Sequence, residues 1–83
     1  MEKETRVAII SMIIENDNII PEVNRLLHEY SLYIRGRMGL PYRERSLNII
    51  CIVVDAPEDS ISALSGKLGR LSGVTSKAVY SKK

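Results

Sequence analysis

The sequence predicts a small α/β (α+β) domain whose strands and helices follow the order βαββαβ. Two runs, residues 6–15 and 47–55, are rich in β-branched residues and apolar on both faces when read as strands. Two further stretches, each near a proline, carry apolar residues at three- and four-residue intervals, which is the period of a helix. The remaining segments, 33–40 and 74–80, mix apolar and polar positions and predict edge strands.

The first strand is predicted over residues 6–15. Alternate positions place Ala8, Ile10, Met12 and Ile14 on one face and Val7, Ile9, Ser11 and Ile13 on the other. Because both faces are largely apolar, this strand is expected at the centre of the sheet. The polar segment Glu15-Asn16-Asp17-Asn18 then predicts a turn.

Each predicted helix begins near a proline, whose missing N–H would have no partner in the first turn anyway. The first covers residues 21–30, and its apolar stripe consists of Val23, Leu26, Leu27 and Tyr30. The second opens at Pro57 and ends at Gly73, and its apolar stripe consists of Ile61, Leu64, Leu68 and Leu71. Small residues form another face of the second helix and predict close approach to a neighbour: Ser62, Ser65, Gly66 and Gly69.

The run over residues 47–55 predicts the second central strand, with Leu47, Ile49, Cys51 and Val53 on one face and Ile50, Ile52 and Val54 on the other. In the edge strand over residues 33–40, alternation places Ile34, Met38 and Leu40 on one face and Arg35 and Arg37 on the other. Residues 39–45 predict a turn region, in which Pro41 cannot donate a ladder hydrogen bond.

This order matches the split βαβ or ferredoxin-like sandwich, a four-stranded antiparallel sheet. Right-handed crossovers would place both helices on one face of that sheet. The opposite face of the two central strands is also apolar, yet the chain has nothing left to cover it. We therefore expect the protein to associate with itself through the sheet, as a dimer or tetramer.

Length and composition indicate one globular domain over residues 1–83, with 45% apolar and 27% charged residues. The net charge is only +2 and no block of basic residues stands out, which disfavours direct nucleic-acid binding. No apolar run reaches the roughly 20 residues of a membrane span, and the first residues lack the apolar core of a signal peptide. A cytoplasmic protein is expected, without membrane contact.

The sequence offers little for catalysis, cofactors or metal binding. His28 is the only histidine and Cys51 the only cysteine, and the two are placed on different elements, which disfavours a nucleophilic pair or a metal site. Ser65-Gly66-Lys67 lacks the earlier glycine of a phosphate-binding loop, and the central strands lack aromatics on which RNA bases stack. We expect no enzyme, no cofactor and no metal site.

The most distinctive stretch runs from Arg35 to Arg45. Four arginines there surround glycines, a proline and a tyrosine: Arg35, Arg37, Arg43 and Arg45 with Gly36, Gly39, Pro41 and Tyr42. Such arginines can hold a carboxylate or phosphate through forked hydrogen bonds. The more ordinary interpretation is a solvated hairpin whose arginines form salt bridges between subunits.

Three blocks of this chain resemble one known family. They are Val23–Tyr30, Gly36–Arg45 and Ile61–Gly69, and the family is that of the iron-only ([FeFe]) hydrogenase system regulators. The resemblance covers nearly the whole chain. It implies an ACT-like fold similar to the C-terminal domain of the nickel-responsive repressor, used for effector sensing and oligomerisation. Members of the family are thought to accompany genes for the hydrogenase and its maturation.

Two departures limit what is carried over from the nickel-responsive repressors. Those proteins bind nickel through several histidines and a cysteine, whereas this chain has only His28 and Cys51. They also carry an N-terminal DNA-binding segment, whereas only a handful of residues precede the first predicted strand. We therefore expect no metal sensing and no DNA-binding segment in this chain.

In ACT-like domains the ligand lies near the loop between the first strand and the first helix. The resemblance thus implies ligand contacts from Glu15, Asn16, Asp17 and Asn18, with Arg35, Arg37, Tyr42 and Arg43 as anion or interface contacts. The function expected is a regulator that binds a small effector as a homo-oligomer. The alternative is an adaptor that binds a protein partner and no metabolite.

Overall fold

The computed structural model describes residues 4–83. Its strands are β1 (Arg6–Ile14), β2 (Ile34–Tyr42), β3 (Leu47–Ala56) and β4 (Val74–Tyr80), and its helices are α1 (Ile20–Glu29) and α2 (Glu58–Gly69). Short 3₁₀ turns separate some of them: η1 (Asp17–Ile19), η2 (Ser31–Tyr33) and η3 (Arg43–Arg45). The predicted order βαββαβ is confirmed.

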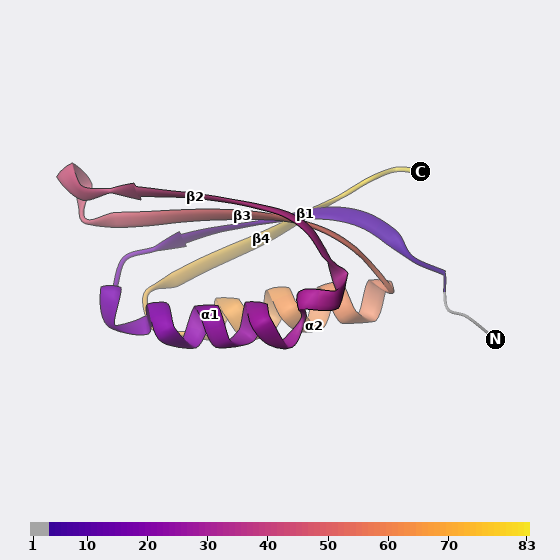
Figure 1. Ribbon diagram of the computed structural model, residues 1–83, viewed down its shortest axis with the longest axis horizontal. Coiled ribbons are helices and arrows are strands. Elements are labelled where there is room, and N and C mark those ends of the chain that lie inside the picture. The colour runs from indigo at the N-terminus through magenta and orange to yellow at the C-terminus, as the bar shows by residue number, and fades with distance from the viewer. Residues whose placement is uncertain (1–3) are drawn as a thin grey trace.

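The strands form one antiparallel sheet in the order β2-β3-β1-β4. The two strands that are apolar on both faces, β1 and β3, lie at its centre as predicted. Both helices pack beneath the same face of the sheet, and none of the elements described in residues 4–83 covers the other face (Figure 1). The molecule is elongated along the strands, with extents of 46 × 20 × 17 Å.

The hydrophobic core lies between the sheet and the two helices. Alternate residues of β1 and β3 supply its upper layer, and the apolar stripes of α1 and α2 supply its lower layer, because each element turns one apolar face toward the other. The largest fully buried side chains are Ile10, Met12, Ile14, Val23, Ile52, Val54, Ile61, Leu64 and Leu68.

A β-bulge in β2 overturns the predicted facing of that strand. Ile34 pairs with Val54, but the next paired residue is Gly36, which lies opposite Val53. The extra residue at the bulge shifts all following side chains to the other face. Ile34 therefore lies on the helix side of the sheet, whereas Met38 and Leu40 point to the uncovered side and are largely exposed.

Two element ends differ from the sequence prediction by more than one residue. Strand β2 runs through Pro41 to Tyr42, which is possible because an edge strand has no neighbouring strand on its outer side, where a missing N–H costs no ladder hydrogen bond. Helix α2 ends at Gly69, before the predicted end at Gly73. Gly73 has a positive φ of 77° and instead forms the turn into β4.

The small-residue face of α2 packs against β4, as predicted. Ser65 shares a hydrogen bond of 3.3 Å with Ser76, and Ser62 shares one of the same length with Tyr80. A Cβ added to Gly69 would lie 3.8 Å from the Cβ of Ser76. Gly66 is the exception, because it lies next to the side chain of Arg70 on the same helix end.

Candidate functional site

The loop between β1 and α1 is held in place by short polar contacts. The Asn16 side chain accepts a hydrogen bond of 3.1 Å from the backbone N–H of Asn18, which caps η1. The side-chain amide of Asn48, at the start of β3, donates to the Asp17 carboxylate at 2.8 Å. The Glu15 N–H donates to the Gly73 carbonyl at 2.7 Å. The loop is thereby tied to two other segments of the chain.

A pocket of about 470 Å³ lies between this loop and the β2–β3 hairpin. Its lining combines charged, polar and apolar side chains: Asp17, Ile20, Pro41, Arg43, Ser46, Leu47 and Asn48. No ion pair joins Asp17 to Arg43 among residues 4–83, so each keeps free hydrogen-bonding groups for a ligand. A carboxylate and a guanidinium around one hollow suit a small molecule that carries groups of both charges.

The structure brings together only part of the predicted site. Asp17 and Arg43 line the same pocket, with Asn16 and Asn18 in the adjoining turn. Glu15 is exposed, and Tyr42 pairs with Leu47 on the side of the sheet that carries no helix.

The two predicted arginines of β2 lie elsewhere. Arg35 is exposed at the bulge, and Arg37 reaches the helix side of the sheet, where it donates to the Asn24 side chain at 2.9 Å. Neither residue lines the pocket beside Asp17. Within one chain, the predicted residues therefore do not all lie together.

Ser46 and Asn48 line the pocket but were not predicted as site residues from the sequence. Asn48 had a recognisable signal, since it is a polar residue near the start of an otherwise apolar strand. Ser46 had none, because its φ of 54° follows from the hairpin geometry and not from its residue type.

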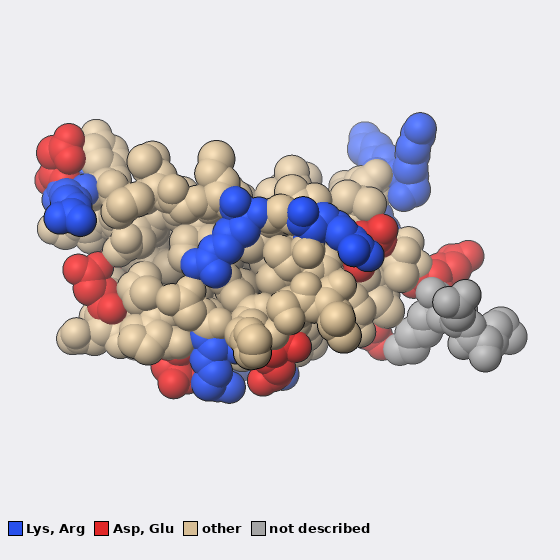
Figure 2. Space-filling model, viewed as in Figure 1, with Lys and Arg blue, Asp and Glu red and all other residues tan. Residues whose placement is uncertain are grey.

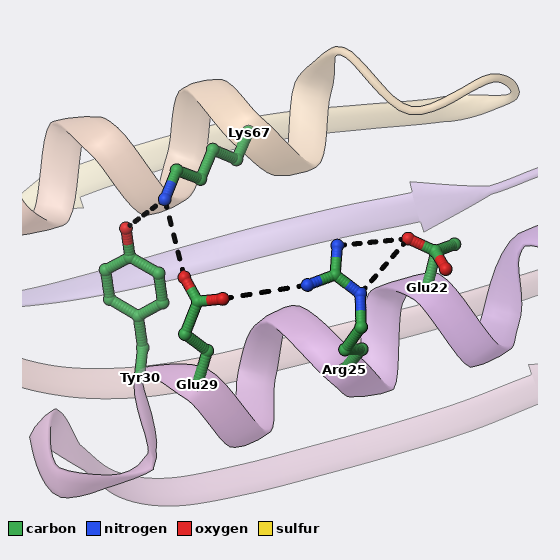
Figure 3. A network of polar contacts seen from close by, with 5 residues as sticks. All are labelled: Glu22, Arg25, Glu29, Tyr30 and Lys67. Carbon is green, nitrogen blue, oxygen red and sulfur yellow. Dashed lines mark hydrogen bonds and ion pairs between the residues drawn. The ribbon is translucent and has the colours of Figure 1, made fainter.

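Elsewhere, polar side chains link the outer surfaces of α1 and α2 (Figure 3). Lys67 of α2 donates to the Tyr30 hydroxyl at 2.9 Å and to Glu29 at 3.4 Å, and Arg25 lies between Glu29 and Glu22. The hydrogen bond to Tyr30 is the main reason why the pKa of Lys67 is raised above its usual 10.5. Partial desolvation opposes that rise, and Glu29 adds to it.

The side chains suited to catalysis or metal binding lie apart from one another in the described residues. Within residues 4–83, no group of three or more His, Cys, Asp or Glu side chains is placed to hold a metal ion. Cys51 lies on the uncovered side of the sheet, with its Sγ 3.5 Å from the Ser11 hydroxyl, and His28 lies on α1. None of the helices described is long and apolar enough to cross a membrane.

The uncovered face of the sheet carries all but one of the exposed large apolar side chains of the described residues. Met38 and Val79 are each 65% exposed and Ile9 is 44% exposed, and large contiguous patches of such side chains are uncommon on monomeric proteins. The other exposed apolar residues of this face are Val7, Ile13, Leu40, Tyr42 and Val53. Figure 2 shows this face as the mostly tan upper margin, whereas charged side chains gather at the hairpin end and along the helices.

Comparisons with known proteins place the chain in a family. Residues 6–78 match the TM1266-like family, which is described as iron-only hydrogenase system regulators. The solved structure of uncharacterized protein TM1266 from Thermotoga maritima is 41% identical and superposes with a TM-score of 0.91, covering 95% of this chain and 100% of that one. No curated protein matches. The chain therefore belongs to the TM1266-like family of iron-only hydrogenase system regulators.

Proposed function

We propose that this protein is a homo-oligomeric regulatory domain of the iron-only hydrogenase system that binds a small effector beside the β1–α1 loop. The observation that carries the proposal is the bare apolar face of the sheet. Each side chain of this kind gains about 1.5–3 kcal/mol on burial, and exposure of so many together invites aggregation. Burial of this face against a partner would therefore raise the stability of the folded domain above that of a lone chain.

A second copy of the chain is the partner that fits this face best. The face is apolar along its middle, and its charged groups are Asp55 and Lys77, which are opposite in sign. A surface with an apolar middle and both charges is complementary to itself, as a two-fold interface requires. Pairing of two such sheets would bury the apolar side chains of both subunits.

The pocket beside Asp17 is the proposed effector site. It offers a carboxylate from Asp17, a guanidinium from Arg43 and an amide from Asn48, next to the apolar side chains of Ile20 and Leu47. Its volume of about 470 Å³ lies within the usual range for small-molecule sites. We propose that a small ligand with both charged and apolar parts binds here, with Asn16 and Asn18 shaping the rim.

Sedimentation of the purified protein at micromolar concentration tests self-association. A dimer or tetramer is expected. A lone chain that stays soluble at that concentration would contradict the proposal that the sheet face pairs with itself.

A thermal-shift screen of amino acids, nucleotides and metal ions tests effector binding, because a ligand that prefers the folded state raises the melting temperature. Asp17→Asn and Arg43→Gln should each abolish most of the shift produced by any hit. Arg45→Gln makes the same charge change on the same turn, outside the pocket lining, and should leave the shift intact. A panel without hits on an intact oligomer would favour the adaptor alternative instead.

A further inference from the structure

We propose that the groove between α1 and β2 is a second binding site, for a small molecule that carries a phosphate group. The groove has a volume of about 430 Å³ and is lined by Asn24, Leu27, His28, Ser31, Ile34 and Arg37. It shares no lining residue with the pocket beside Asp17. The site is therefore distinct from the effector pocket proposed above.

The polar side chains of this groove are hydrogen-bond donors or neutral groups, without a carboxylate. Arg37 comes from β2, while His28 and Ser31 come from the last turn of α1 and the residues that follow it. A guanidinium, an imidazole and a hydroxyl that line one groove from different elements suit the several oxygens of a phosphate. Leu27 and Ile34 supply an apolar floor for the rest of a ligand.

Arg37 is oriented for this role by its contact with α1. Its Nη2 donates to the Asn24 Oδ1 at 2.9 Å, which directs the guanidinium toward the groove. Within residues 4–83, no acidic side chain forms an ion pair with Arg37, in contrast to Arg25 on the outer side of α1, which contacts Glu22 and Glu29. The positive charge of Arg37 is thus not neutralised by any acidic side chain of the described residues.

The bulge in β2 is what brings Arg37 to this groove. Without the extra residue between Ile34 and Gly36, the alternation of the strand would place Arg37 on the opposite face from Ile34. Bulges occur often next to functional sites because they re-aim a side chain without breaking the strand. Figure 2 shows basic side chains lying across the boundary between the sheet and the helix layer on this side of the molecule.

The C-terminal end of α1, which borders the groove, disfavours a bound anion. This end of the helix carries the partial negative charge of the helix dipole. The charge of Arg37 must therefore supply most of the attraction, and its removal should have a larger effect than removal of His28.

The experiment is a titration of the full chain with inorganic phosphate at constant ionic strength, followed by NMR. We expect saturable shifts of the signals of His28, Ser31 and Arg37. Arg37→Gln should weaken binding at least about tenfold and His28→Asn about threefold. The matched control is Arg35→Gln, on the same strand but outside the groove, which should leave the affinity unchanged.

Several results would overturn the assignment. These are the absence of saturable shifts, shifts spread evenly over the basic residues, or an equal loss of affinity in Arg35→Gln. Acetate that binds as tightly as phosphate would also count against a phosphate site. Melting curves show whether each variant is still folded. If Arg37→Gln is unstable, His28→Asn provides a second test.

Discussion

Ser46 adopts a backbone conformation that side-chain-bearing residues seldom adopt. Its φ of 54° and ψ of 41° lie in the left-handed region, at the end of η3 in the β2–β3 hairpin. A Cβ in this region meets the following carbonyl oxygen and costs about 1–2 kcal/mol. The hairpin thus stores strain beside the proposed effector pocket.

Replacement of Ser46 by glycine should stabilise the protein. The strain energy removed is larger than the entropic cost of a more flexible unfolded chain, which is about 0.5–1 kcal/mol. The free energy of unfolding should therefore rise by roughly 0.5–1 kcal/mol. Thermal unfolding followed by circular dichroism measures it. Ser46→Ala retains the Cβ and should show no gain, and equal melting temperatures for both variants would contradict the explanation.

Gly73 is needed where it lies because the turn before β4 is tight. Its φ is 77°, and an added Cβ would come within 2.9 Å of the Asn16 Cβ. Gly73→Ala should therefore destabilise the protein by about 1–3 kcal/mol. Gly39→Ala is the control, because nothing lies within 4 Å of its added Cβ. Urea unfolding compares them, and a similar loss in both variants would show that crowding at Asn16 is not the cause.

Helices α1 and α2 contact each other through polar groups at their outer edges. A chain of ion pairs from Glu22 through Arg25 and Glu29 to Lys67, called the ladder below, joins the two helices. At its Lys67 end, the ammonium also donates a hydrogen bond to the Tyr30 hydroxyl (Figure 3). The ammonium lies 5.1 Å from the ring centroid of Tyr30, but its short contact is with the hydroxyl. Because these side chains are half-exposed, solvent screens the ladder, and its contribution to stability is small.

The Lys67 contacts predict a pH dependence on the alkaline side. The folded protein raises the pKa of Lys67 above 10.5, so the folded state holds this proton more tightly than the unfolded state does. The stabilisation is complete below about pH 10.5 and is lost as the pH rises through the higher folded value.

Midpoints of urea unfolding measured between pH 9 and pH 11 test whether stability falls as the pH rises. Stability of the natural protein should fall over the upper part of that range, and Lys67→Met should flatten the fall. Lys82→Met, at the exposed C-terminal end, is the control and should behave like the natural protein. Identical pH curves for the natural protein and Lys67→Met would show that the ladder does not matter for stability.

The described part of the molecule is a sheet with helices on one side only. The sheet has two apolar faces, but the helices cover just one of them. The proposed pairing of sheets resolves this imbalance, and it also places the β2–β3 hairpin, which extends past the helices in Figure 1, near a second subunit. Met38 and Leu40 on that hairpin would be buried by such a partner. The pockets on the helix side would remain open.

A charge on the bare sheet face should separate the subunits. Ile9→Glu introduces a carboxylate in the middle of β1, where pairing would bury it without a partner, at a cost of several kcal/mol. Sedimentation should show a shift to the lone chain. Leu32→Glu is the matched control, since Leu32 is 87% exposed in η2, away from this face. An oligomer that survives Ile9→Glu but not Leu32→Glu would place the interface on the helix side.

Local sequence pattern was enough to predict most of the fold. Runs that are apolar on both faces identified β1 and β3 as central, because only a strand with a layer or partner on each side keeps such residues from water. The three- and four-residue spacing of Val23, Leu26 and Leu27 identified the buried side of α1. For the pocket, the polar loop at Asp17 and the arginine at Arg43 were recognisable as residue types suited to a ligand.

The sequence by itself determined the order of elements and the two faces of each central strand, because these depend on neighbours within a few positions. Only the tertiary structure decided where the arginines of β2 point, since the bulge after Ile34 reverses the alternation and Gly36 beside it does not by itself specify a bulge. The pairing of Asn48 with Asp17, and the separation of Arg37 from Arg43, likewise depend on how distant segments pack. Strand register, which couples residues far apart in the chain, is the physical reason for that division.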